Sequence, residues 1–411
     1  MTTDAQDTAR AAADARPALP RAFWWLWTAM LVNRLGGFVL VFLSLFVTLE
    51  RGRSASFAGL VTTVYGVGGA VGGGVLADRL GRRVTLLGSQ LLTALATGAP
   101  AFAQGRVALL VTACLVGLAG NASRPVVQAV VADVVTAAAR VRAFSLLYWA
   151  VNIGVAVSAA LAGVLAGRGH VLLFLAEAAL TVLCALTVYL TVPETRPDPA
   201  GPASATSPAG AGGLARHRRF LAFVAVTFVA GLLMQEVSTA LPLSMARAEH
   251  TARDYGLVIS LNGLLAVALQ LPAGRVLSRY GPAGPLVVGA LLLGGGLGLT
   301  AVAGSLTAYA LTVVVWTVGE IVLAPTSTAT AAELVPGHAH GRYQGVCSFA
   351  WAAAACVAPA VSGYALDTVG PTALWGASAA LGAGRWRPAG TGSSCADGTT
   401  TDEQREDRDG R

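Results

Sequence analysis

The sequence contains no lysine, because all 28 of its basic residues are arginine. The phosphate-binding loop of nucleotide-driven pumps requires a lysine at the phosphates, and Schiff-base enzymes require a lysine amine. Both classes are therefore excluded. The chain also lacks the H-E-x-x-H and G-x-S-x-G patterns of metalloproteases and serine hydrolases. We expect a protein that is not an enzyme.

Charged residues of both signs are scarce. They make up 12% of the 411 residues, whereas soluble domains carry about 25%. Hydrophobic residues make up 55%, and the mean hydropathy is +0.65. Apolar runs of about 20 residues recur along the whole chain, as in multi-pass membrane proteins. We predict an all-α membrane protein that has the lipid bilayer, and not nucleic acid, as its partner.

Cysteines are few and widely spaced. The five residues form no C-x-x-C pair, so the sequence predicts neither a disulfide framework nor a metal site. No cofactor is predicted either. The polar residues 1–21 include three acids and are unlike a cleaved signal peptide, so we expect a cytoplasmic N-terminal tail.

Twelve apolar segments predict twelve transmembrane helices. A stretch rich in proline, glycine, alanine and serine at 194–219 predicts a cytoplasmic linker between two six-helix bundles, 22–193 and 220–388. Residues 389–411 have the composition of a disordered C-terminal tail. The segments run over 22–49, 56–77, 84–104, 107–132, 143–167, 170–192, 220–244, 255–277, 282–303, 307–331, 343–366 and 371–384.

The loop arginines are distributed unequally between the two sides of the membrane. If the N-terminus is cytoplasmic, most of them fall inside, because cytoplasmic loops carry an excess of basic residues. We therefore expect both termini in the cytoplasm of a cell-membrane protein. The arginines on the other side are Arg51, Arg53, Arg106, Arg168, Arg247 and Arg253.

The two halves of the chain repeat. "GVLADRLG" at 74–81 recurs as "GRVLSRYG" at 274–281, and the same offset relates Pro125 to Pro325 and Arg142 to Arg342. Parallel repeats of six helices are the layout of one large class of secondary transporters.

The first copy of this loop has two possible interpretations. Gly72, Gly74 and Ala77 fit the dinucleotide pattern G-x-G-x-x-A, but no acid follows about 20 residues later, as such a site requires. The stretch "GVLADRLGRR" instead resembles the signature loop of the major facilitator superfamily. The matching residues are Gly74, Asp78, Arg79, Gly81, Arg82 and Arg83, with Arg279 in the second copy.

The resemblance implies two helical bundles that rock about a central cavity, with Asp78 and its arginines as a cytoplasmic latch between them. An alternative is that these arginines only anchor the loop near lipid phosphates. The glycines before the loop are expected to let helix backbones pack closely.

Polar residues within the spans are candidates for the substrate cavity or for coupling, because charges there are costly and usually functional. A carboxyl that moves between an arginine and an apolar environment changes its affinity for a proton. A permanent structural ion pair is the alternative. The candidates are Asn33, Arg34, Arg124, Gln128, Tyr148, Trp149, Asn152, Glu177, Gln235, Glu236 and Glu320.

The fifth segment occupies the place of the superfamily's antiporter motif. Gly154 and Gly163 fit that motif, but Ser158 and Ala159 replace its central glycine and proline. This departure weakens the prediction of proton-driven export.

The last apolar segment is short. Residues 371–384 end at "RWRP", whereas a span needs about 20 residues. Either a short helix lets its arginines reach the inner face, or a reading-frame shift replaced the end of this helix.

Together these features predict a monomeric secondary transporter for a small hydrophobic or amphipathic molecule, with export by proton antiport and a proton gradient as the energy source. The alternative is a non-transporting membrane sensor or scaffold of the same fold, or an impaired copy with a frame-shifted last helix.

Overall fold

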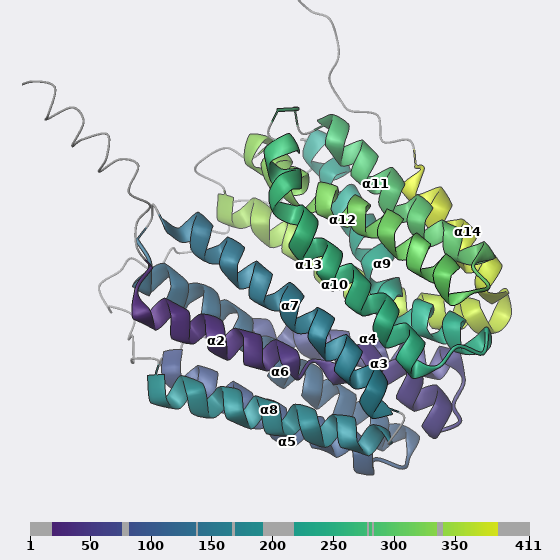
Figure 1. The fold of residues 1–411 in the computed structure, drawn as a ribbon, viewed down its shortest axis with the longest axis horizontal. Coiled ribbons are helices and arrows are strands. Elements are labelled where there is room, and N and C mark those ends of the chain that lie inside the picture. Colours follow the sequence, from purple (N-terminus) through teal and green to yellow (C-terminus); the bar gives the residue numbers. More distant parts are fainter. Residues whose placement is uncertain are drawn as a thin grey trace, which may run out of the picture.

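The computed structural model describes residues 19–75, 82–136, 139–166, 169–191, 218–277, 279–281, 283–334 and 340–384. Within these ranges the chain is helical and contains no strand, and the helices lie side by side (Figure 1). They are α2 (Arg21–Leu35), α3 (Phe38–Leu45), η1 (Phe46–Glu50), α4 (Ala55–Val75), α5 (Arg82–Phe102), α6 (Arg106–Val134), α7 (Arg140–Ala166), α8 (His170–Thr191), α9 (Arg218–Arg247), α10 (Ala252–Leu277), α11 (Ala283–Gly298), η4 (Leu299–Val302), α12 (Leu306–Leu334), α13 (His340–Thr368) and α14 (Gly370–Gly382).

Seven of these helices are long and apolar enough to cross a membrane. The prediction of an all-helical, multi-pass protein is therefore confirmed, and the helix ends lie within about three residues of the predicted segments. The number of twelve spans and their grouping into two bundles stay predictions. The last helix, α14, has 13 residues, which gives a length of about 20 Å.

The first predicted segment, 22–49, is not one continuous helix. It is divided into α2, α3 and the π-helical turn η1, and the break falls at Gly36 and Gly37. Glycine weakens a helix interior because it gains the most freedom on unwinding. A side chain at Gly36 would also lie 3.1 Å from Leu180 on α8, so close packing favours glycine here.

One end of the structure is defined by short connections, and we call it the distal end. It holds the C-termini of η1, α9 and α13 and the N-termini of α4, α10 and α12. Helices α4, α10 and α12 are capped there by serine or threonine. The Ser54 hydroxyl accepts from the Phe57 amide, and the Ser305 hydroxyl accepts from the Ala308 amide. Thr251 and Asp254 cap α10 reciprocally, as in a capping box. Such caps satisfy the free amides of each first turn.

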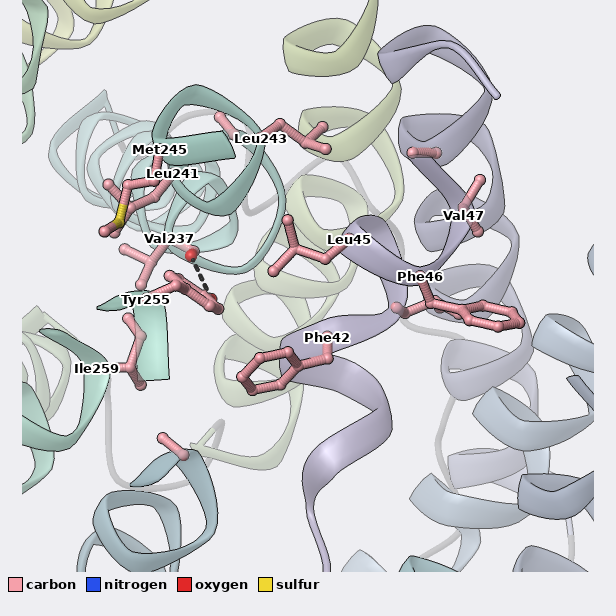
Figure 2. Packing of buried hydrophobic residues seen from close by; sticks show 14 of the residues in the cluster. Phe42, Leu45, Phe46, Val47, Val237, Leu241, Leu243, Met245, Tyr255 and Ile259 are labelled. Atoms are coloured by element: carbon pink, nitrogen blue, oxygen red, sulfur yellow. Dashed lines mark hydrogen bonds between the residues drawn. The ribbon is translucent and has the colours of Figure 1, made fainter. Parts of the chain in front are cut away.

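The two halves of the chain pack together near the distal end through α3 on α9, α4 on α13 and α7 on α10. Figure 2 shows the region where α3 meets α9 and α10, in which Phe42 of α3 lies beside Tyr255 of α10 with ring centroids 5.6 Å apart. The Tyr255 hydroxyl donates to the Val237 carbonyl at 3.0 Å. The Ser44 hydroxyl donates to the Ser238 carbonyl at 3.3 Å. A continuous apolar core therefore joins the halves.

Glycines allow the close contacts of α4 with α13 and of α7 with α10. A Cβ at Gly59 of α4 would lie 2.1 Å from the Pro359 carbonyl oxygen of α13. A Cβ at Gly256 of α10 would lie 2.4 Å from the Ala159 carbonyl oxygen of α7. Only glycine permits backbones to approach so closely. The expected role of glycine in helix packing thus extends to contacts between the two halves.

Candidate functional site

A group of polar side chains lies between α10 and α12. The Asn262 amide nitrogen donates to Glu320 Oε2 and to Thr317 Oγ1, at 3.0 Å in each case. Thr317 and Glu320 are three residues apart and therefore share a face of α12. The amide thus holds the carboxyl group and the hydroxyl group together on one side of this helix.

The first half of the chain contributes α7 to the same region. The Tyr148 phenol lies within the electrostatic range of the Glu320 carboxyl group. One turn further on, the Asn152 amide donates to the Tyr148 carbonyl at 2.9 Å. Asn152 also adjoins α10, because a Cβ at Gly263 would lie 2.9 Å from its carbonyl oxygen. Figure 1 shows α7 and α10 side by side. The polar group therefore includes residues of both halves.

Glu320 has no ion-pair partner among the residues that the structure describes. The sequence had suggested arginines as partners. The Cβ of Arg34 is packed against Gly154 of α7. The side chains of Arg124 and Gln128, on α6, lie outside the described residues. A part-buried carboxyl that has no ion-pair partner in the described part of the chain can bind a proton or a cationic group.

A second polar group lies within the first half. The Asn33 amide donates to Gln90 Oε1 on α5 at 3.1 Å. Arg34 follows Asn33, and the Glu177 backbone lies 3.6 Å from the position of a Cβ at Gly36. Asn33, Arg34 and Glu177 are therefore close to the break between α2 and α3. Arg34 also borders α7, because its Cβ packs against Gly154, two residues after Asn152.

Glu236 belongs to a third region, between α9 and the short helix α14. It is buried and accepts a hydrogen bond of 2.7 Å from the Ser378 hydroxyl. Nearby, the Trp375 indole donates to the Ser244 hydroxyl at 3.2 Å. Gln235, the residue before Glu236, is only part-buried. Glu236 thus ties α14 to α9 and does not contact Glu320.

The indole nitrogen of Trp149, on α7, is buried without a hydrogen-bond partner among the described residues. Such a donor is costly to bury unpaired. The indole is therefore a candidate donor to a polar ligand beside α7.

Much of the predicted cytoplasmic latch lies outside the described residues. Helix α4 ends just after Gly74, and residues 76–81, with Asp78, Arg79 and Gly81, are not described. Arg82 and Arg83 begin α5, but their side chains are not described. Arg279 follows α10 and is exposed. The latch stays a prediction.

Two residues of the site were missed in the sequence. Asn262 and Thr317 are uncharged, and Asn262 is the one amide in the apolar stretch "LVISLNGLLAVA". An isolated amide within a span was the available signal, since polar side chains in membranes usually find partners on neighbouring helices.

The helices and their polar contacts define a multi-pass membrane protein with a polar group between its two halves. Residues 26–359 match the Major Facilitator Superfamily. The chain therefore belongs to this family of membrane transporters, and the family indicated by the loop at 74–83 is confirmed.

Three proteins illustrate the similarity. The chain is 28% identical to the multidrug resistance protein MdtH of Aeromonas hydrophila over 333 residues, covering 78% of this chain and 82% of MdtH. It is 26% identical to the uncharacterized MFS-type transporter YttB of Bacillus subtilis over 365 residues, covering 87% and 91%. The crystal structure of the nucleoside transporter NupG has a TM-score of 0.73 at 14% identity, covering 89% of this chain and 97% of NupG.

Proposed function

We propose that this protein exports a small hydrophobic or amphipathic molecule in exchange for protons. Two six-helix bundles, made from twelve spans with a short last helix, alternate in exposing a central site to either side of the membrane. The similarity to MdtH favours a multidrug type of substrate. The protein acts as a monomer in the cell membrane with both termini in the cytoplasm.

The observation that carries this proposal is the position of Glu320. Its carboxyl group accepts from Asn262 on α10 and lies near Tyr148 on α7. It therefore stands where helices of both halves meet. No arginine neutralises it among the described residues, so a proton is the simplest partner for its charge.

Coupling follows from the place of Glu320 where the two halves meet. A rocking motion opens the space around it to water on one side of the membrane at a time. Hydration favours the ionised carboxylate, whereas closure of the site favours the protonated form. A proton is thereby bound on one side of the membrane and released on the other. The energy comes from the proton gradient, without a cofactor.

The test is efflux of a panel of lipophilic cations and antibiotics from everted vesicles, with and without a proton gradient. Glu320→Gln keeps the shape of the side chain but cannot ionise. We expect at least a tenfold loss of gradient-driven transport and no remaining pH dependence. Glu249→Gln is the matched control, because Glu249 is exposed in the turn between α9 and α10.

The control should transport at the normal rate. A Glu320→Gln protein that retains the pH dependence would place the proton site on another residue. If the flux of every compound is the same with and without the proton gradient, proton antiport is contradicted.

A further inference from the structure

Asp367, in the last turn of α13, joins the second half of the chain to the first at the distal end. Its Oδ2 atom accepts from the Ser56 backbone amide at 2.7 Å and from the Ser56 hydroxyl at 2.5 Å. Ser56 lies in the first turn of α4. The two residues are 311 positions apart in the sequence, so this contact exists only in the folded protein.

The other carboxylate oxygen of Asp367 is held within the second half. Oδ1 forms an ion pair with Arg247 Nη2 at 2.7 Å. A second nitrogen of the same guanidinium donates to the Leu366 carbonyl. Arg247 is the last residue of α9. The arginine therefore fixes the orientation of the carboxylate, which then presents its free oxygen to α4.

The physical effect on α4 is that of a helix cap. The amides of a first turn have no partner within their helix, and a carboxylate there also interacts favourably with the helix dipole. Ser54, in the preceding loop, supplies one such acceptor, for Phe57. Asp367 supplies another from the opposite half of the chain. The cap of α4 is thus complete only while the halves are in contact.

The surroundings fit a contact that forms and breaks. The Asp367 side chain is 25% exposed and that of Arg247 is 39% exposed, so water can replace the bonds. The same pair of helices is joined by the Ala360 amide, which donates to Thr63 Oγ1 at 3.1 Å. Separation of α4 from α13 leaves the ion pair intact, because both of its members belong to the second half.

We propose that Asp367 is a positioning residue of the transport cycle, which holds the distal end closed by capping α4 across the two halves. This proposal rests on the proposed alternation of two bundles. The distal end is the predicted outer side, so Asp367 acts opposite the cytoplasmic loop of Asp78. Loss of the cap shifts the protein toward the state that is open at the distal end.

Amide hydrogen exchange of the full chain in lipid nanodiscs tests this proposal, since exchange rates report how often a region opens. Two segments are followed: 55–63 on α4, which meets Asp367, and 157–166 on α7, which packs on α10 and does not. In Asp367→Ala we expect exchange in both segments to rise roughly tenfold, the effect of losing a helix cap. Glu249→Ala, which removes an acid from the same end, should leave both unchanged.

Faster exchange in 55–63 alone would mean local fraying of α4 and would overturn the proposal. So would unchanged exchange in both segments. If Asp367→Ala does not fold, Ser56→Ala and Asp367→Asn serve instead, with a smaller rise expected in both segments. The measurement needs neither substrate nor gradient. Failure of the export assay with a positive exchange result therefore refutes the transport proposal and not the role of Asp367.

Discussion

Gly59 sets how closely α4 and α13 approach, so a single methyl group at this position should open the distal end. In Gly59→Ala, the new Cβ would lie 2.1 Å from the Pro359 carbonyl oxygen and 3.2 Å from the Gly363 Cα. An ordinary contact begins at 3.4 Å. Both neighbours are backbone atoms and cannot rotate away. The helices must therefore move apart by roughly 1 Å or more.

The energetic cost of such overpacking is about 1–3 kcal/mol. It falls only on the state in which α4 and α13 touch. The ratio of distal-closed to distal-open protein should therefore decrease by roughly 5- to 150-fold. Gly66 provides a milder case, because a Cβ there would lie 2.8 Å from the Ala355 carbonyl oxygen. We expect Gly66→Ala to shift the ratio less.

Spin labels at positions 49 and 369 provide the assay. Leu49 and Val369 are 56% and 63% exposed and belong to different halves at the distal end. In proteoliposomes, the distance between the labels should increase in both variants. The increase should be larger in Gly59→Ala than in Gly66→Ala. Gly98→Ala is the control, because a Cβ at Gly98 of α5 meets no atom within 4 Å. Alanine there should be neutral or slightly stabilising.

Equal distance distributions for Gly59→Ala and Gly98→Ala would refute the reasoning. They would show that the helices absorb the methyl group without separating.

Two further predictions concern the polar contacts within the second half. Asn262→Ala removes both hydrogen bonds that hold Glu320 and Thr317. We therefore expect gradient-driven efflux to fall about tenfold, with a normal amount of the protein in the vesicles. An unchanged efflux rate would show that Asn262 is not part of the site. Ser378→Ala removes the hydroxyl group that donates to the buried Glu236 carboxyl group, which should destabilise the protein by about 1–3 kcal/mol. A melting temperature in detergent equal to that of the unaltered protein would contradict the tie between α9 and α14.

The sequence predicted much of the candidate site because charge within an apolar span is rare. Glu320 was identified in this way, and it lies at the contact between α10 and α12. The hydrogen-bond partner of Glu320 was not identified in the sequence. The charges suggested an arginine, whereas the described residues show the neutral amide of Asn262 as a partner. The side chain of Arg124 lies outside the described residues. Polar residues without charge are common in spans, so composition does not single them out.

The role of Asp367 could not be predicted from the sequence either. A single acid at the end of an apolar segment has many ordinary roles, and nothing near it in the sequence suggests a partner. Its contact with Ser56 depends on how α4 and α13 cross.

The amino-acid sequence by itself determined the helices and the family, because both depend on local properties: apolar length, glycine and proline positions, and the charged loop at 74–83. Only the tertiary structure decided which helix faces meet. It brought Tyr148 and Asn262 to Glu320 and placed Asp367 on the N-terminus of α4. The physical reason is that these contacts join residues far apart in the chain, and close backbone packing at glycines selects them.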